Sequence, residues 1–390
     1  MMPRLPAHCR SLSRSVRTFP PLLIALLSMG VAAGSLPAAD SSDSGGVALE
    51  ALKRLEGIDL DENPAVKQAV LRVLENHRGR PVFVQIVKQF DLRDHAPELL
   101  EIVVKHPATE HGVEAMRLLL TQGHSDRVRE ALSGSDPDAA IPLVTALGLS
   151  GAHESVPLLE PLLENPEVPA ALRKEAVVAL SRTEPGARTL LDRAEAQTLP
   201  ADVRLTASTT LASARWPAIR DRASELLPPP ASRNAEPLPP IAELVQRQGD
   251  PIRGREVFDS PTAACVTCHQ VRGRGVDFGP DLSEIGDKLG KDALYEAILD
   301  PNAGVSFGYE AWQLDLKSGD QAYGIIVSET EDEIAIKNAQ AIVSRFPTSQ
   351  IVGRVRMEQS IMPAGLQMAM TPRELVDLVE YLASLKKAAD

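Results

Sequence analysis

The spacing of apolar residues divides the chain into a long helical region and a shorter mixed region. Between about residues 48 and 227, apolar residues recur three and four positions apart, which is the pattern of amphipathic helices. Glycine and proline interrupt this pattern repeatedly, so we expect many short helices. The clearest apolar faces are those of Val66, Val70, Val73 and Leu74, of Leu99, Leu100 and Val103, and of Leu158, Leu159, Leu162 and Leu163.

A weak repeat runs through this helical region. The pairs Ala146-Leu147, Ala179-Leu180 and Thr210-Leu211 each fall late in an expected helix, at steps of 33 and 31 residues. A helical pair repeated at this period is typical of an α-solenoid, in which each repeat buries its apolar face against its neighbours. Residues 48–227 therefore resemble HEAT-like repeats, and an irregular helical bundle is the alternative.

A proline-rich stretch ends the helical region. Residues 228–240 hold six prolines in thirteen positions, a density that excludes helix and favours an extended polyproline spacer. We take it as a linker to a second domain at residues 241–390. In that domain, Asp250-Pro251 is suited to start a helix, residues 291–299 predict another, and Thr371–Glu374 forms a capping box before a third.

The second domain changes its pattern between about residues 302 and 357. Apolar and polar residues alternate there in short runs separated by turns, which predicts a small β-rich insertion. Trp312, Leu314 and Leu316 share one face of the first run, and we expect Trp312 and Tyr309 to lie in the core of the insertion. The expected strands are 309–316, 323–327, 333–337, 342–346 and 351–355.

The first 39 residues have the composition of an export signal. Four arginines and no acidic residue precede an uncharged run at 19–39, which ends in small residues suited to cleavage before Asp40. This pattern predicts a cleaved secretory signal peptide at residues 1–39. The alternative is an uncleaved anchor, because the 21 uncharged residues would nearly span a bilayer.

Composition and charge narrow the function. The chain is 44% hydrophobic and 24% charged, as ordinary folded proteins are, and only 3% aromatic, which suits a helical core of Leu, Val and Ala. Its formal charge is −12, and loss of residues 1–39 with their four arginines would leave 37 basic against 53 acidic residues, or −16. Nucleic-acid binding needs clustered positive charge and is not indicated. An acidic carrier could dock on a basic patch of a partner.

The cysteines carry the candidate chemistry. Cys9 lies in the signal segment, so only Cys265 and Cys268 would remain after cleavage, and His269 follows them directly. Two thiols one helical turn apart can add across the two vinyl groups of a haem. The adjacent imidazole can reach the iron from the same side, so C-x-x-C-H predicts covalent attachment of haem c.

Other uses of these cysteines fit less well. A structural disulfide is possible in an oxidising compartment, although C-x-x-C loops are short and strained. A thioredoxin-like pair would follow a strand of a βαβ unit, and none is predicted before Cys265. A zinc site needs four ligands, and the remaining histidines are scattered through the repeats without a metal-ligand grouping. No hydrolase, P-loop or dinucleotide-binding motif is present.

Around this motif, residues 248–388 resemble the c-type cytochromes. Gly254-Arg255 and Phe258 precede it as in the N-terminal helix of that family, and Gly279–Leu282 looks like the loop that follows the haem motif. Ser360–Leu366 resembles the loop that presents a methionine on the distal side. The family likeness also implies that the C-terminal helix crosses the N-terminal helix at Gly254.

The resemblance assigns roles around one haem c. Its two thioether bonds would come from Cys265 and Cys268, and His269 would be the proximal iron ligand. The Pro280 carbonyl would orient His269 through its other ring nitrogen. The distal ligand would be Met362.

The spacing of the two iron ligands departs from that of a compact cytochrome, since 92 residues separate His269 from Met362. The β-rich insertion accounts for the excess. The combination with helical repeats resembles the haem-binding domain of planctomycete and verrucomicrobial type. Because of the insertion, Met357, Met368 and Met370 are rivals for the distal position, although methionine more often fills gaps in a core.

Together these patterns predict a mainly α protein, with an α-solenoid (HEAT-like) followed by a cytochrome c-like helical domain that carries a small β-rich insertion. The expected function is one-electron transfer by a periplasmic c-type cytochrome, which would accept electrons from a dehydrogenase partner. Two alternatives stay open: a haem-dependent redox enzyme with an open distal site, and a repeat-based interaction scaffold with an accessory haem. Membrane attachment is expected only if the signal is uncleaved.

Overall fold

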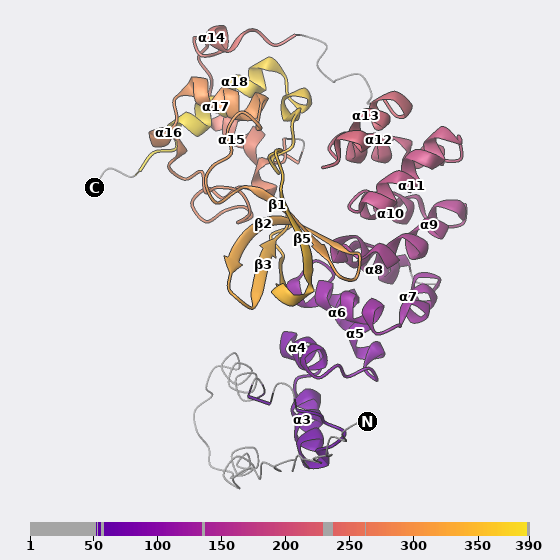
Figure 1. Cartoon of the computed structure of the whole chain (residues 1–390). Helices are drawn as coiled ribbons and strands as arrows, with labels where there is room; N and C mark the ends of the chain where they lie inside the picture. Colours follow the sequence, from indigo (N-terminus) through magenta and orange to yellow (C-terminus); the bar gives the residue numbers. More distant parts are fainter. Residues whose placement is uncertain are drawn as a thin grey trace, which may run out of the picture. The chain divides into compact units, whose positions relative to one another are not determined.

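The computed structural model describes residues 52, 54–55, 58–134, 137–228, 237–261 and 263–387 (Figure 1). The expected signal peptide lies outside these residues, and so does most of the expected linker. The chain divides into two units, one up to Arg78 and one from Gly79 onwards. In the first unit, α3 (Pro64–Asn76) has a proline in its first turn and buries Val70 and Leu74, as its apolar spacing predicts.

Short helices follow one another through the first half of the second unit, as expected. Their apolar faces are buried, including Leu99, Val103, Leu158 and Leu159. They are α4 (Pro81–Gln89), α5 (Ala96–Lys105), α6 (Glu110–Thr121), α7 (Ser125–Leu132), α8 (Pro137–Ser150), α9 (Val156–Glu164), α10 (Ala170–Leu180), α11 (Glu184–Glu195), α12 (Arg204–Ala212) and α13 (Pro217–Leu226).

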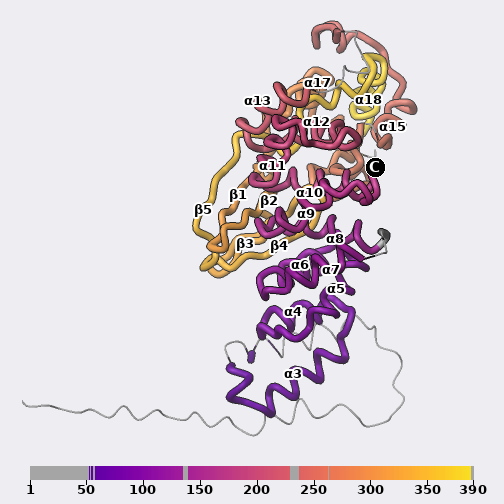
Figure 2. The backbone as a smooth tube through the Cα atoms, turned by 90° about the vertical axis from the view of Figure 1, so that its right-hand side faces the viewer, coloured from indigo at the N-terminus to yellow at the C-terminus, as the bar shows by residue number. Residues whose placement is uncertain are grey.

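Alternate helices of this series pack on one another. Helix α6 contacts α8, α8 contacts α10 and α10 contacts α12, and Figure 2 shows the helices succeeding one another in a row. Leu147, Leu180 and Leu211, which mark the weak sequence repeat, are all buried. Helices α8 and α10 come so close that a Cβ on Gly148 would lie 2.7 Å from Ala179. Within the described part of the chain, no helix is both long and apolar enough to cross a membrane.

A second group of helices, the C-terminal bundle, comprises α14 (Ile241–Leu244), α15 (Pro251–Asp259), α16 (Ile285–Lys288), α17 (Lys291–Leu299) and α18 (Pro372–Ser384). The predicted helix starts are confirmed. The Asp250 side chain accepts a hydrogen bond from the N–H of Ile252, and Thr371 and Glu374 form the capping box. The apolar face of α18 is buried in the core of the bundle.

Helices α15 and α18 cross at Gly254, as the family likeness implies. A Cβ on Gly254 would overlap the carbonyl oxygen of Asp377 and would lie 2.7 Å from the Cβ of Tyr381. One turn further, the rings of Phe258 and Tyr381 meet edge to face with centroids 5.7 Å apart. Glycine is needed at this crossing because the two backbones approach more closely than a side chain would allow.

Asp377 fastens the start of α15 to α18. Its buried carboxylate accepts hydrogen bonds from the backbone N–H of Asp250 at 2.7 Å and from Nε of Arg253 at 2.9 Å. Nε of Arg373 lies 3.3 Å from the same carboxylate. Burial alone would raise the pKa of Asp377, but these hydrogen bonds and arginine charges outweigh it and hold that pKa below its usual value.

We expect Asp377→Asn to lower the free energy of unfolding by about 2 kcal/mol at neutral pH, the usual worth of hydrogen bonds to a charged group. Because the pKa of Asp377 is lower in the folded than in the unfolded state, its contribution is complete above the unfolded-state value of about 4. The contribution is lost as the pH falls through the folded-state pKa. Urea unfolding should therefore show a difference between the two proteins that shrinks in acid. A difference independent of pH would contradict the ionic contribution.

The predicted β-rich insertion is confirmed. Among the described residues it forms a five-stranded antiparallel sheet in the order β4-β3-β2-β1-β5. Each strand overlaps one of the predicted runs: β1 (Ala311–Leu316), β2 (Gln321–Glu329), β3 (Glu333–Lys337), β4 (Val343–Pro347) and β5 (Ile351–Arg356). The chain enters and leaves the sheet at one place, where the N–H of Met357 donates to the carbonyl oxygen of Ala311 at 2.9 Å.

One face of the sheet encloses a small core of its own. Leu314, Ile334, Ile336 and Phe346 are buried together, and Trp312 packs against them as predicted. The insertion therefore has an apolar core separate from that of the bundle that it interrupts. Figure 1 shows it between the bundle and the row of helices.

The opposite face of the sheet packs on the helices. Arg215, between α12 and α13, lies 4.0 Å from the ring centroid of Trp216 and 4.8 Å from that of Tyr323. Its guanidinium donates to the side-chain oxygens of Gln313 and Gln321. Burial lowers the pKa of Arg215 to about 10, which is still well above neutral pH. The contact combines cation–π and hydrogen-bonding interactions of a partly buried arginine.

Helix α6 makes a second contact with the sheet at β4. Arg117 donates to the hydroxyl of Ser344 at 2.9 Å, and its guanidinium lies 5.1 Å from the centroid of the Phe346 ring. Arg117 also donates to the carbonyl oxygen of Ser150 at 2.9 Å, so the end of α8 is joined to the same point.

A third contact joins His153 to the turn between β1 and β2. Both the backbone N–H and Nδ1 of His153 lie 2.9 Å from a carboxylate oxygen of Asp320. Glu154 is close as well, so the ligand atoms of these three residues lie within 4.8 Å of one another. The expectation that His153 has no such neighbours is therefore wrong, because Asp320 reaches it from the insertion.

Candidate functional site

Cys265 begins a short helical turn, Cys265–Thr267, and Cys268 follows directly as its C-cap residue. Ala264 enters the turn with φ at 56°, and the N–H of His269 closes it by donating to the carbonyl oxygen of Cys265 at 2.9 Å. No disulfide joins the two thiols. Burial, with a smaller effect of Cys268, raises the pKa of the Cys265 thiol to about 11, so this thiol is protonated at neutral pH.

His269 is held in one orientation. Its Nδ1 lies 2.8 Å from the carbonyl oxygen of Pro280. A carbonyl only accepts, so Nδ1 carries the proton and Nε2 keeps its lone pair. Burial lowers the pKa of His269, although the Pro280 hydrogen bond opposes this. The result is a neutral imidazole whose Nε2 is available to a metal, with the Pro280 contact that the family likeness implies.

The loop that supplies Pro280 is fastened to the cysteine turn. The N–H groups of Phe278 and Gly279 both donate to the carbonyl oxygen of Cys268, at 3.2 and 2.7 Å. A Cβ on Gly279 would lie 2.5 Å from Cε1 of His269 and 2.8 Å from its Nδ1. The glycine therefore leaves space for the imidazole ring, a role that the sequence pattern Gly279–Leu282 did not reveal.

Cys265, Cys268 and His269 line one cavity with a volume of about 270 Å³. Most of the other lining side chains are apolar, and none is a lysine or an arginine. They include Phe258, Phe278, Leu282, Leu294, Ile298, Met362, Leu366, Met370, Leu378 and Leu382. The cavity is thus an apolar pocket of the kind that takes a large apolar ligand.

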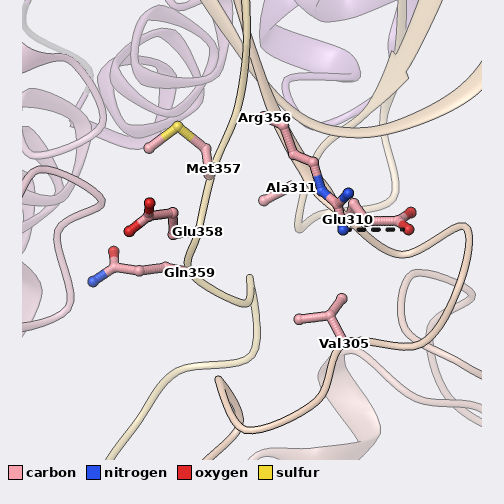
Figure 3. Close-up of a pocket in the computed structure, with 7 residues that line it drawn as sticks. All are labelled: Val305, Glu310, Ala311, Arg356, Met357, Glu358 and Gln359. Atoms are coloured by element: carbon pink, nitrogen blue, oxygen red, sulfur yellow. Dashed lines mark ion pairs between the residues drawn. The ribbon is translucent and has the colours of Figure 1, made fainter.

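The four methionines considered for the distal position differ in whether they line this cavity. Met362 is half-buried and lines this cavity, and Met370, which is 4% exposed, lines it too. Met368 is 51% exposed and is not part of the lining. Met357 lies instead at a second cavity, of about 330 Å³, at the base of the sheet (Figure 3). Of the four methionines in question, Met362 and Met370 thus face the same space as His269.

The second cavity carries charged side chains. Glu310 and Arg356 pair on one side of it at 3.7 Å, and the side chains of Met357, Glu358 and Gln359 lie on the other side (Figure 3). It has no thiol or imidazole, so it offers no site for a covalently attached haem.

The insertion also contributes residues to the first cavity. Ile325 of β2 lines it, and so does Tyr309, which lies in the loop before β1. The expectation that Tyr309 lies in the core of the insertion is wrong. Alternation along 309–316 could not show this, because the strand begins only at Ala311 and the preceding loop turns toward the bundle.

These residues fit a haem. Two thiols and a neutral imidazole stand on one short turn, the imidazole lone pair is free, and the surrounding walls are apolar. A porphyrin with its iron needs each of these.

Residues 252–322 match the cytochrome c family model. No curated protein matches the chain. The cytochrome c match contains Cys265, Cys268, His269 and Pro280, and it ends within β2. The chain therefore carries a c-type cytochrome domain, which implies covalently bound haem c and suggests haem-based electron transfer. Domains of the cytochrome c family are typically exported. Met362 and α18 lie beyond the match, so the distal side of the cytochrome c site is defined by the cavity alone.

Proposed function

We propose that this chain is an exported electron carrier with a single haem c, attached through Cys265 and Cys268 and bound axially by His269 and Met362. The supporting observation is that both thiols, the imidazole and the Met362 side chain line one apolar cavity. Bound there, the haem would supply a one-electron couple, and methionine as an axial ligand would raise its potential.

The protein's own residues would prepare and protect this couple. The Pro280 carbonyl keeps the proton on Nδ1 of His269, so Nε2 faces the cavity in its neutral form. Phe258, Phe278 and Leu382 exclude water, which lowers the local dielectric and limits the reorganisation that accompanies electron transfer. With ligands on both faces there would be no open position for a substrate, so we favour a carrier over an enzyme.

We further propose a periplasmic location, an acidic docking surface for a redox partner such as a dehydrogenase, and membership of the planctomycete and verrucomicrobial type. The formal charge of −16 without residues 1–39 supports a partner with a basic patch. The row of helices, which we propose to be HEAT-like repeats, would supply further protein contacts. The contacts of Arg117 and Arg215 with the sheet support a fixed position of the haem beside those helices.

Mass spectrometry tests haem attachment. The full chain, produced in a host that matures c-type cytochromes, should carry the mass of one haem and begin near Asp40. We expect the double variant Cys265→Ala/Cys268→Ala to lose the added mass completely, because no thioether bond can form. A wild-type chain with both thiols free would refute the proposed function.

The same preparations test the distal ligand. Met362→Ala should abolish the weak absorption at the red end of the oxidised spectrum that accompanies methionine on iron. Met368→Ala, at an exposed position outside the cavity, is the matched control and should leave this absorption unchanged. Persistence of the absorption in Met362→Ala would assign the distal role to another residue, with Met370 the next to test.

A further inference from the structure

The sheet touches the loop that orients His269. Lys337, the last residue of β3, donates from Nζ to the carbonyl oxygen of Asp277 at 2.8 Å, and its Nζ lies 3.5 Å from the Asp277 carboxylate. The Lys337 side chain is only 16% exposed, although the carboxylate is 74% exposed. The hydrogen bond to the Asp277 backbone therefore contributes more to this contact than the ion pair does, because exposed ion pairs add little stability.

Asp277 lies three residues before Pro280, whose carbonyl oxygen accepts the hydrogen bond from the imidazole of His269. The next two residues, Phe278 and Gly279, donate their N–H groups to the Cys268 carbonyl, and Pro280 accepts from Nδ1 of His269. A movement of the Asp277 carbonyl would therefore act on the ring of His269 through a short segment that is hydrogen-bonded at Phe278, Gly279 and Pro280.

The sheet can resist such a movement because it is fixed on its other side. Strand β2 is held to the helices by the contacts of Arg215 with Gln321 and Tyr323. Strand β3 pairs with β2, and Gly324 of β2 lets the backbone at Lys337 approach closely, because a Cβ there would overlap the Lys337 carbonyl. Ile325, the residue that pairs with Lys337, lines the cavity.

We propose that Lys337 is a positioning residue, through which the inserted sheet fixes the 276–280 loop and thereby the orientation of His269. The functional consequence of this role rests on the proposed function: with a haem bound, a fixed imidazole would keep the iron ligand in place in both redox states. The role of the contact in ordering the loop does not depend on a haem. The inserted sheet would thus connect the row of helices, through Arg215, to the loop that orients His269, through Lys337.

Hydrogen exchange of the full-length protein tests this inference. In Lys337→Met, which keeps the unbranched four-atom stem of the side chain but removes the ammonium group and its N–H donors, the amides of Phe278 and Gly279 should exchange about tenfold faster, as expected for the loss of one hydrogen bond. Lys337→Arg retains donors and should keep the slow exchange. Lys317→Met, at an exposed lysine of the turn after β1, is the matched control and should change nothing.

The pattern of exchange decides the result. Acceleration confined to the 276–280 loop supports the positioning role. Equal acceleration in α18 would reflect a loss of global stability and would overturn it, as would a Lys337→Met protein that behaves like Lys317→Met. Mass spectrometry of the same samples reports haem attachment separately. A chain without haem would refute the proposed function, whereas a haem-loaded chain with unchanged loop exchange would refute only the role of Lys337.

Discussion

Replacing Gly279 by alanine is expected to displace the imidazole of His269 while leaving both thioether bonds intact. The added Cβ would stand 2.5 Å from Cε1 and 2.8 Å from Nδ1 of the ring, closer than non-bonded atoms approach. The ring must therefore move away from the loop, and the hydrogen bond to Pro280 would be lost at about 1 kcal/mol or more. We expect a full complement of covalent haem with an altered absorption spectrum and a mixture of spin states.

Gly304→Ala is the matched control for this variant. Gly304 lines the same cavity, yet a Cβ there would meet no atom within 4 Å. Its spectrum should be that of the wild type. If Gly279→Ala also kept the wild-type spectrum, the close contact between Gly279 and the ring would have no influence on ligation.

Replacing Gly254 by alanine should destabilise the bundle by about 3 kcal/mol, in the upper range for overpacked cores. In an ordinary helix this substitution stabilises by up to about 1 kcal/mol, because alanine is the better helix former. Here the new Cβ would overlap the Asp377 carbonyl oxygen, so α15 and α18 would have to separate. Separation would also weaken the contact between the rings of Phe258 and Tyr381.

Thermal or urea unfolding of the full chain measures this effect. Glu256→Ala is the control, because Glu256 lies at an exposed position on the same helix, where alanine meets no close backbone and adds only a small gain in helix propensity. A stabilised Gly254→Ala protein would show that the crossing is looser than its geometry indicates. The sign of the change is therefore as informative as its size.

Local signals predicted much of the fold. The helix starts at Asp250-Pro251 and Thr371–Glu374 could be predicted because capping depends on neighbouring residues only. The strands could be predicted from alternation, as Glu333–Lys337 illustrates. The docking of the sheet on the helices could not be predicted. Arg117 and Arg215 donate to side chains that lie 227 and 98 residues further along the chain, and such contacts leave no periodic pattern in the sequence.

The site divides in the same way. That Cys265, Cys268 and His269 lie together could be predicted because they are close in the sequence, and the contact of Pro280 with His269 followed from the family likeness. Gly279, Tyr309 and Ile325 were missed as cavity residues, since each acts through shape or position and not through a reactive group. Whether Met362 or Met370 reaches an iron depends on the path of the chain after β5, which spacing along the sequence does not determine.

The hydrogen bond between Met357 and Ala311 has a consequence for how such chains can vary in length. Because the two ends of the sheet are joined there, the chain leaves the bundle and returns to it at nearly the same point, whatever the number of residues inside the insertion. The interval between the C-x-x-C-H motif and Met362 is then free to lengthen or shorten over time without shifting His269 or Met362. A fixed interval is for that reason a poor criterion for recognising other chains built on this plan.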